Sequence, residues 1–271
     1  MTVSIDTILA EARDRFNFLI DYEDAQLHLL PGVLSGARRF VDVGANRGLY
    51  SYVANALLSG GEIIAVEANP DLSQQLEQNM MTWPNPNGNK LRVMHSAAGD
   101  KNTTLPFSIG VEDTLGTLTT DSDYLVEGAP TIEVAVRRLD DLVPPGPRTV
   151  LKIDVEGFEF RALRGAERHM KEPDCTIIIE LHSWGDVEVG KYPHDVMSLL
   201  RQAGFGFERS GEAHQFVCRH CHPVNSWTSY LRNMPKFRAK NFLRRTGIRQ
   251  LIYGKNRSST DALRERSGIR Q

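Results

Sequence analysis

A glycine-containing loop that follows a short apolar run places the tightest constraint on this chain of 271 residues. The run FVDVGANRGLYS, residues 40–51, passes from apolar residues into Asp42, Gly44 and Gly48 and then into a segment with helical periodicity. Glycine is needed where a backbone turns tightly and lets another group approach closely. The unit therefore predicts strand, loop and helix, with the loop either a bare turn or one side of a ligand site.

Short apolar runs and helical segments alternate along the rest of the chain. This alternation predicts a doubly wound α/β fold, a mostly parallel Rossmann-like sheet with helices on both faces. The runs expected to form this sheet, including an antiparallel edge strand at its end, are residues 39–43, 62–66, 91–95, 150–154, 175–181, 206–209 and 214–219. Residues 99–142 lose the helical periodicity, which indicates strands in an inserted hairpin.

Three segments are expected. Residues 1–38 should form an N-terminal helical segment, because Ile8, Leu9, Ala12 and Phe16 recur at helical spacing. Residues 39–222 should form the Rossmann-like domain, and residues 223–271 a basic C-terminal extension. From residue 232 to the end there are 12 Lys and Arg against 2 acids, so with a net charge of −2 the preceding residues carry −12. The extension could dock on an anionic membrane surface, pack on the acidic body or remain a solvated tail.

Compartment and metal content are constrained by what the sequence lacks. No apolar run approaches the roughly 20 residues of a membrane-spanning helix, and the start, MTVSIDTILAEARDRF, lacks the pattern of an export signal. Three cysteines agree with a reducing compartment, so we expect a cytoplasmic protein, peripheral at the inner membrane surface if the extension docks there. Cys218 and Cys221 form a C-x-x-C without a second pair, so no structural zinc site is predicted.

The end of the second strand indicates which kind of ligand the loop binds. This strand ends in Glu67, nineteen residues after Gly48, where a carboxylate can accept hydrogen bonds from ribose hydroxyls. A nicotinamide dinucleotide fingerprint needs glycine at the positions that Asn46 and Leu49 occupy. The pattern D-x-G-x-x-x-G suits S-adenosylmethionine better, because that cofactor has no pyrophosphate to seat on a helix N-terminus.

Several motifs together resemble the FkbM-type methyltransferases, a family of Rossmann-like, adenosylmethionine-dependent enzymes. The motifs that carry the resemblance are FVDVGANRGLYS from Phe40, AVEANP from Ala65, HSAAGD from His95, VAVRRLDDL from Val134 and LKIDVEGFEFRALRGAE from Leu151. The resemblance covers about residues 39–209 and implies a seven-stranded sheet and methyl transfer, usually to an oxygen of a sugar, polyketide or related metabolite.

The resemblance also assigns roles to individual residues by position. It implies that the methionine part of the cofactor is lined by Asp42, Gly44, Asn46 and Gly48. Glu67 would hold the ribose, with Asn69 a near neighbour of the ribose or adenine. Ser96 and Ala97 would lie beside the adenine.

Acidic residues and a histidine end two of the expected strands, where ligands bind in open α/β sheets. Asp154 and Glu156 follow the fourth strand, and Glu180 and His182 end the fifth. Methyl transfer requires removal of the acceptor's proton, and His182 is expected as the general base because its ordinary pKa lies near neutrality. The alternatives are a structural histidine, helix-dipole acids at Glu156 and Glu159, and a divalent-cation site at Asp154, Glu180 and His182.

The expected function is O-methylation of a sugar, glycan or other small-metabolite hydroxyl. A non-catalytic scaffold that binds an adenosine ligand is the alternative from another class, and an NAD-linked oxidoreductase is disfavoured by the missing glycines. Nucleic acid is not expected as a partner, since the body is acidic and no recognition motif is present. Neither the acceptor's identity nor the oligomeric state follows from the sequence.

Overall fold

The structure is a computed structural model that describes residues 4–109, 117–118, 130–182, 193–211 and 214–220. All of them belong to the unit formed by residues 1–226, and the unit formed by residues 227–271 lies outside the described part. No helix among the described residues has the length and apolar character needed to cross a membrane.

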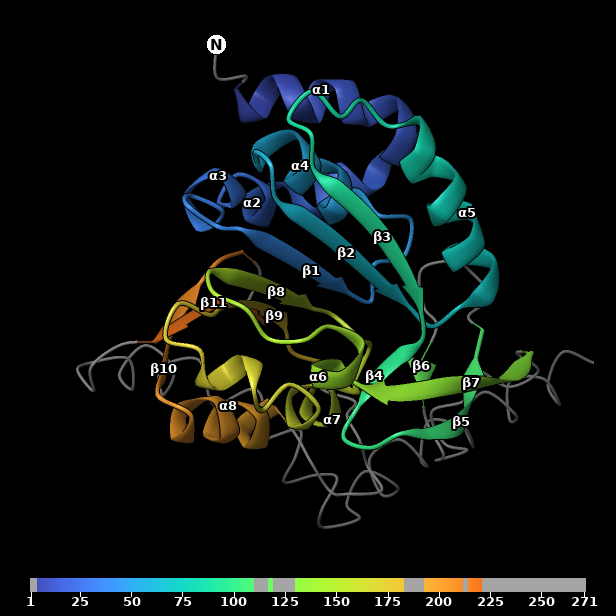
Figure 1. Ribbon diagram of the computed structural model, residues 1–271, viewed down its shortest axis with the longest axis vertical. Helices are drawn as coiled ribbons and strands as arrows, with labels where there is room; N and C mark the ends of the chain where they lie inside the picture. Colours follow the sequence, from blue (N-terminus) through green and yellow to red (C-terminus); the bar gives the residue numbers. More distant parts are fainter. Residues whose placement is uncertain (1–3, 110–116, 119–129, 183–192, 212–213, 221–271) are drawn as a thin grey trace, which may run out of the picture. The chain divides into compact units, whose positions relative to one another are not determined.

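The main element is a seven-stranded sheet (Figure 1). Its strands, in spatial order, are β10 (Phe205–Arg209), β11 (Gln215–His220), β9 (Thr176–Glu180), β8 (Thr149–Ile153), β1 (Arg39–Val43), β2 (Glu62–Glu67) and β3 (Lys90–His95). The neighbours from β9 to β3 pair in parallel, and β11 pairs antiparallel with both β9 and β10. The predicted doubly wound, mostly parallel fold is confirmed, with the reversed strand placed one position inside the edge.

The inserted region forms a second sheet. Its strands, in spatial order, are β4 (Ala97–Gly99), β7 (Thr131–Arg138), β5 (Thr103–Ser108) and β6 (Thr117–Leu118). The long hairpin expected between residues 99 and 142 is the antiparallel pair of β5 and β7. Because β4 follows β3 after a single residue, this sheet begins beside the carboxyl end of β3 (Figure 1).

Helices cover both faces of the seven-stranded sheet (Figure 1). They are α1 (Ile5–Phe16), α2 (Phe18–Leu27), α3 (Leu30–Val33), α4 (Leu49–Leu57), α5 (Pro70–Thr82), α6 (Leu139–Leu142), α7 (Glu159–Arg164) and α8 (Pro193–Gln202), with a 3₁₀ turn at His169–Lys171. Apolar residues of α1 to α5 pack with Phe40, Val150 and Ile178 into one core cluster, so these helices share a face. The helices α7 and α8 lie on the opposite face.

The N-terminal segment is broken, where the sequence predicts one helix. Asn17 has a φ of +46° and ends α1, and its backbone N–H donates to the carbonyl of Arg13. Asparagine tolerates this region of backbone space better than most residues. The break turns α2 back over the sheet, with Ile20 and Leu27 fully buried.

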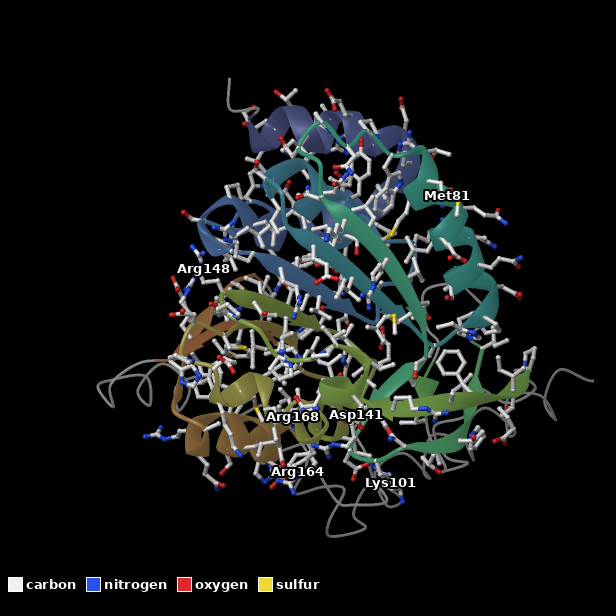
Figure 2. All side chains as sticks on the ribbon, viewed as in Figure 1. Met81, Lys101, Asp141, Arg148, Arg164 and Arg168 are labelled. Atoms are coloured by element: carbon white, nitrogen blue, oxygen red, sulfur yellow. The ribbon has the colours of Figure 1, made fainter. Side chains whose placement is uncertain are left out.

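The sequence predicts a helix from Phe158 to about Lys171 after the fourth strand, because its charged residues fall on one outer face, but α7 ends at Arg164. A Cβ on Gly165 would overlap the carbonyl oxygen of Gly99, so the chain after α7 passes β4 at a distance that only glycine allows. The carboxylate of Asp140 then accepts the backbone N–H groups of Arg168 and His169 at 3.0–3.2 Å. Arg168 and Asp141, labelled in Figure 2, form an ion pair on the outer side of this turn.

Candidate functional site

The strand order reverses between β1 and β8. From β1 the sheet continues through β2 to β3, whereas β8, on the other side of β1, leads to β9. Ligands of open α/β sheets bind outside the carboxyl ends of the strands at such a reversal. The loops that begin with Gly44 and Asp154 lie there, which brings together the two motifs that the sequence predicts as a site.

Gly44 fits against the other loop only because it has no side chain. It has a φ of +78°, and a Cβ would overlap the backbone carbonyl oxygen of Asp154. The N–H groups of Gly44 and Ala45 donate to the carbonyl of Val66 at 2.9 and 3.1 Å. The glycine loop is thus fixed to both β2 and the loop after β8, and Gly48 leads it into α4.

Glu67 ties the same loop from the end of β2. Its two carboxylate oxygens accept the backbone N–H groups of Asn46 at 2.7 Å and of Asn69 at 2.8 Å. Burial raises the pKa of Glu67, and these backbone hydrogen bonds oppose the rise. Asn69 in turn caps α5, because its side-chain oxygen accepts from the N–H groups of Asp71 and Leu72. Glu67 and Asn69 therefore each stabilise the local backbone, besides any contact that they make with a ligand.

Ser96 and Ala97 lie next to Glu67 on the far side from Gly44. The Ser96 N–H donates to the carbonyl of Glu67 at 3.0 Å, and its hydroxyl donates to the carbonyl of Ala135 at 3.0 Å. Ala97 belongs to a small apolar cluster with Val136 and Phe158. The structure places Ser96 beside Glu67 at the end of β2, and the contact of Ser96 and Ala97 with an adenine stays a prediction.

The residues that face α1 to α4 change from apolar to polar toward one edge of the sheet, where β1, β8 and β9 end and the antiparallel β11 begins. On β1, β8, β9 and β11 the apolar members of this face are Phe40, Val150, Ile178 and Val217, and the polar members two positions away are Asp42, Lys152, Glu180 and Gln215. Alternate residues of a strand share a face. The register pairs Asp42 with Lys152 and Glu180 with Gln215, so a band of polar side chains crosses the sheet.

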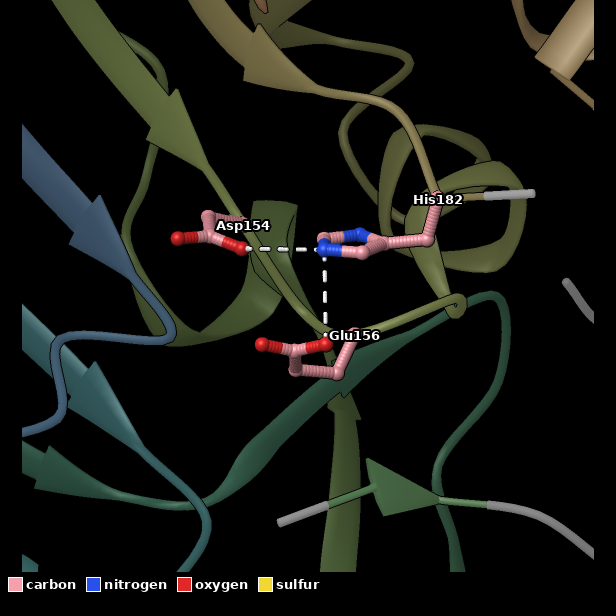
Figure 3. A group of neighbouring side chains, drawn as sticks. All are labelled: Asp154, Glu156 and His182. Atoms are coloured by element: carbon pink, nitrogen blue, oxygen red, sulfur yellow. Dashed lines mark ion pairs between the residues drawn. The ribbon is translucent and has the colours of Figure 1, made fainter. Parts of the chain in front are cut away.

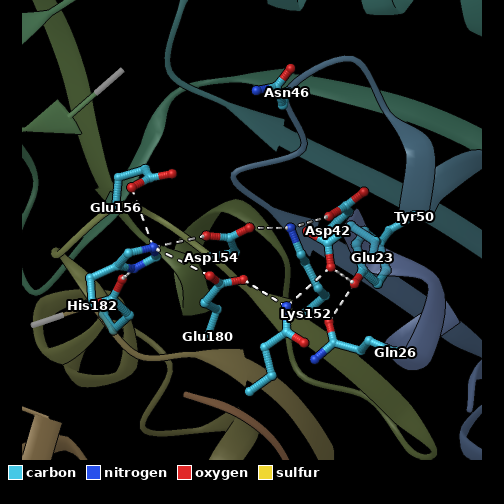
Figure 4. Close-up of polar contacts among 12 residues, drawn as sticks. Glu23, Gln26, Asp42, Asn46, Tyr50, Lys152, Asp154, Glu156, Glu180 and His182 are labelled. Carbon is cyan, nitrogen blue, oxygen red and sulfur yellow. Dashed lines mark hydrogen bonds and ion pairs between the residues drawn. The ribbon is translucent and has the colours of Figure 1, made fainter. Parts of the chain in front are cut away.

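Lys152 is a buried cation at the centre of this band (Figure 4). Its Nζ lies 3.0 Å from Asp154 Oδ2, 3.9 Å from Asp42 Oδ1 and 4.7 Å from the centre of the Tyr50 ring. Burial acts to lower the pKa of Lys152, but Asp154, Asp42 and Glu23 raise it above the ordinary value. Asp42 Oδ2 accepts from the N–H and hydroxyl of Ser51, whereas Oδ1 has no hydrogen-bond partner among the described residues.

His182 lies among four carboxylates just beyond β9. Its Nε2 is 3.3 Å from Glu156, 3.7 Å from Glu180 and 3.9 Å from Asp154, and its Nδ1 is 2.7 Å from Glu159 Oε1 (Figures 3 and 4). Burial acts to lower the pKa of His182, but the charge and hydrogen bond of Glu159 and the charges of Asp154 and Glu156 raise it to about 10. The imidazole therefore carries a positive charge at neutral pH.

The carboxylates around His182 differ in their proton affinity. Burial raises the pKa of Glu156 to about 7, His182 opposes the rise, and the neighbouring acids add to it. Burial also acts to raise the pKa of Glu180, but hydrogen bonds from His214 and Gln215 and the charges of His182 and His214 lower it to about 2. Glu156 has a φ of +50°, an uncommon conformation for its residue type. Of Glu156 and Glu180, Glu156 has the pKa nearer to neutrality.

The site includes residues to which the sequence assigns no role. Lys152 stands in a buried strand, where an ammonium group needs a carboxylate partner. A lysine within this apolar run could therefore have been predicted from the sequence to form a buried ion pair. Glu159, weighed only as a helix-dipole acid, is buried and binds His182. The remaining unforeseen members come from segments far along the chain and are Glu23, Gln26, Tyr50, His214 and Gln215.

A divalent cation at Asp154, Glu180 and His182 is not supported. Ligand atoms of Asp154, Glu156 and His182 do lie within 4.8 Å of one another, as do those of Glu23, Asp154 and Glu180. However, a protonated imidazole offers no lone pair to a metal, and Lys152 already binds Asp154.

Comparison with known proteins identifies the family. The model of the methyltransferase FkbM domain matches residues 42–207, which is more than half of the chain. The chain belongs to the FkbM methyltransferase family. The matched span contains all the site residues predicted from the sequence, whereas Glu23, His214 and Gln215 lie outside it.

Individual FkbM-type relatives are distant. The hexuronic acid methyltransferase AglP of Haloferax volcanii is 26% identical over 179 residues, which are 62% of this chain and 63% of that protein. The crystal structure of the methyltransferase FkbM of Methylobacillus flagellatus has a TM-score of 0.46 at 16% identity, over 79% of this chain and 57% of that one. A methyltransferase-like protein of Silicibacter pomeroyi has a TM-score of 0.45 at 13% identity, over 78% of this chain and 93% of that one.

Some expectations concern residues outside the described part. These are the basic extension, residues 110–116 and 119–129 of the inserted region, and Cys221 in the C-x-x-C. The three-segment division, the docking of the extension on an anionic surface and the cytoplasmic location therefore stay predictions.

Proposed function

We propose that this protein is an S-adenosylmethionine-dependent methyltransferase that methylates a hydroxyl group of a sugar, a glycan or a similar small metabolite. The observation that carries the proposal is the contact between Gly44 and the backbone of Asp154. This contact places a nucleoside-type loop and a cluster of ionisable side chains at one crevice of the sheet. A scaffold that only binds a nucleoside would need the loop without the cluster.

The residues around the loop fit the proposed cofactor. Glu67 keeps lone pairs for ribose hydroxyls beside its two backbone hydrogen bonds. The oxygen of Asp42 without a hydrogen-bond partner offers an acceptor for the amino group of the methionine part. When bound, adenosylmethionine supplies a methyl group activated by its sulfonium.

Glu156 is the general base in this proposal, in place of His182. A base must be unprotonated before the reaction and works best with a pKa near the working pH. The pKa of Glu156 is about 7, whereas His182, with a pKa of about 10, already holds its proton. Glu156 would accept the acceptor's hydroxyl proton, and His182, 3.3 Å away, would hold the carboxylate in place.

The acceptor class rests on one relative. The Haloferax volcanii protein is named for hexuronic acid methylation, and its match spans less than two thirds of either chain. This supports a sugar acceptor as a class and leaves the particular sugar open.

The test combines cofactor binding, methyl transfer and pH dependence. Labelled adenosylmethionine incubated with fractionated glycan and metabolite extracts should label a glycan or sugar fraction. With that fraction as acceptor, kcat/KM should rise as pH increases through about 7, because Glu156 must lose its proton. Glu156→Gln should lower kcat by about 10² to 10⁴-fold and remove this rise, with cofactor affinity retained.

Three outcomes contradict parts of the proposal. Adenosylmethionine binding without transfer to any fraction would support the binding scaffold. Binding of NAD in preference to adenosylmethionine would support the alternative function, an NAD-linked oxidoreductase. A pH profile that is unchanged in Glu156→Gln would remove Glu156 as the base while leaving the methyltransferase function intact.

A further inference from the structure

The residue proposed as the general base stands in an uncommon turn of the backbone. The N–H of Phe158 donates to the carbonyl of Val155 at 3.2 Å, which closes a four-residue turn. The two residues at the centre of this turn, Glu156 and Gly157, have φ values of +50° and +101°. Glycine adopts such values freely, whereas a glutamate does so only where its surroundings hold it there. The turn therefore needs a contact that stabilises it.

Glu159 makes this contact. Its Oε1 accepts the backbone N–H of Gly157 at 2.8 Å, and the residue is buried. Glu159 is the first residue of α7, and Phe158 is the N-cap residue before it. A side chain that caps a helix accepts an N–H of the N-cap residue or of the first helical turn, and Gly157 precedes both. The hydrogen bond from Gly157 thus stabilises the turn and not the helix.

The same oxygen also holds His182. Glu159 Oε1 lies 2.7 Å from Nδ1 of the imidazole, which donates to it when the ring is protonated. Nε2, on the other side of the ring, lies 3.3 Å from Glu156 Oε2 (Figure 3). One oxygen atom of Glu159 therefore fixes Glu156 in two ways. It holds the backbone of the next residue, and it holds the ring that faces the carboxylate of Glu156.

We propose that Glu159 is a positioning residue for methyl transfer, which acts through Glu156 by holding that carboxylate where it can accept the proton of the acceptor. A general base must lie within hydrogen-bond reach of the proton that it removes. A misplacement of about 1 Å can lower a rate by about 10²-fold. The inference rests on the proposed function, in which Glu156 is the general base, and adds the residue that keeps this base in place.

Two substitutions of Glu159 separate its reach from its charge. Glu159→Gln keeps a side-chain oxygen that can accept from both partners, without the charge. Glu159→Asp keeps the charge, but its side chain is one C–C bond shorter and cannot reach both partners. In the full chain, with the glycan fraction that takes up label as acceptor, Glu159→Asp should lower kcat by about 10- to 100-fold and Glu159→Gln by less than about threefold. The affinity for adenosylmethionine should be retained in both.

The kcat is measured at a pH above the value of about 7 at which Glu156 loses its proton, so that both variants start with an ionised base. Stability should change in the opposite order to kcat. Glu159→Gln removes one carboxylate charge beside the protonated imidazole, so its melting temperature should fall more than that of Glu159→Asp. A residue that serves only the fold would instead lower kcat and the melting temperature together.

The Glu156→Gln background tests whether Glu159 acts through Glu156. In this background Glu159→Asp should lower kcat by less than about twofold, because the residue that it positions is already removed.

Hydrogen exchange of the Gly157 amide, followed by NMR on glycine-labelled protein, reports on the turn without an acceptor. The exchange should be about tenfold faster in Glu159→Asp than in the wild type. Glu167→Asp is the matched control, because it shortens an acid that follows the same helix and pairs with Arg164 near the surface. It should change neither kcat nor this exchange.

The proposal is overturned if Glu159→Gln has a kcat as low as that of Glu159→Asp, since the charge and not the reach would then matter. It is also overturned if the Gly157 amide exchanges equally fast in the wild type and in Glu159→Asp. An equal loss of kcat from Glu159→Asp with and without Glu156→Gln would reject this inference alone. A wild-type kcat in Glu156→Gln itself would remove the general base of the proposed function, and this inference with it.

Discussion

The two sides of the crevice satisfy their polar groups in different ways. In the glycine loop, the carboxylate of Glu67 is held by backbone N–H groups, and Gly44 lies against a backbone carbonyl. In the cluster around His182, each of the four carboxylates pairs with the imidazole, and Glu159 also accepts a hydrogen bond from a backbone N–H, that of Gly157. One side is thus defined by the path of the backbone, and the other by a balance of charges.

This difference predicts opposite sensitivities. The glycine loop should tolerate a change of charge better than a change of shape, because its contacts are backbone contacts at close range. The cluster should tolerate a change of shape better than a change of charge, because a buried carboxylate that loses its partner is costly. Substitutions on each side can test this comparison.

Gly44→Ala should give the largest loss. The new Cβ would overlap the carbonyl oxygen of Asp154, and the φ of +78° is unfavourable for alanine. A left-handed residue costs roughly 1–2 kcal/mol and an overpacked site roughly 1–3 kcal/mol, so the free energy of unfolding should fall by about 4 kcal/mol. Chemical denaturation measures this, and S-adenosylmethionine binding should be lost with it.

Gly36→Ala is the matched control. Gly36 has a similar φ of +74°, and no atom lies within 4 Å of the position of a Cβ. Its loss should be only the backbone part, about 1 kcal/mol. Equal decreases in the free energy of unfolding for the two variants would show that backbone conformation alone matters at Gly44. The close contact between the two loops would then contribute nothing to stability.

The same distinction explains how much the sequence reveals. The glycine loop, Glu67 and the strand-end acids lie in short contiguous motifs, so their residues could be predicted and their neighbourhood inferred from the rule for strand ends. Glu23 and Gln215 join the site through long-range register, because Gln215 is opposite Glu180 only once β11 is paired antiparallel with β9. No local pattern contains that pairing.

The fold follows the same principle. Apart from β3 at the edge, the parallel strands are nearly continuous apolar runs buried on both faces, so their positions could be predicted within two residues. The end of α7 could not, because periodicity describes a helix in isolation, and the turn after α7 makes hydrogen bonds from the N–H groups of Arg168 and His169 to Asp140 of α6.

His182→Gln should give the second largest loss. Glutamine keeps a polar group near Glu159 but removes the positive charge among four carboxylates. Breaking a buried ion pair costs roughly 3–5 kcal/mol, so the free energy of unfolding should fall by about 3 kcal/mol at pH 7. The pKa of His182 is raised from near 6.5 to about 10 by the folded environment. Its contribution is therefore complete below pH 6.5 and disappears as the pH rises through 10.

Denaturation of wild type and variant across this pH window measures the difference. The gap between the two should be widest near pH 6.5 and should close toward pH 10 as the imidazole loses its proton, since groups that do not interact with His182 cancel. His28→Gln is the control, because His28 pairs with Asp6 and Asp24 at the surface and should cost less than about 1 kcal/mol. A gap for His182→Gln that does not change with pH would mean that the imidazole acts by packing and not by charge.

Glu67→Gln should give the smallest change on stability and a selective change on binding. One side-chain oxygen remains to accept a backbone N–H group, and the amide nitrogen replaces the acceptor at the other, so the loop loses one of the two ties to Asn46 and Asn69. Charge-assisted hydrogen bonds to ribose hydroxyls would be weakened, which predicts a loss of about 2 kcal/mol in adenosylmethionine binding by calorimetry. Glu62→Gln, at the other end of β2 and paired with Arg39, should leave binding unchanged. If Glu67→Gln binds the cofactor as the wild type does, Glu67 serves the loop alone, and the glycine-loop side of the comparison is wholly a matter of backbone geometry.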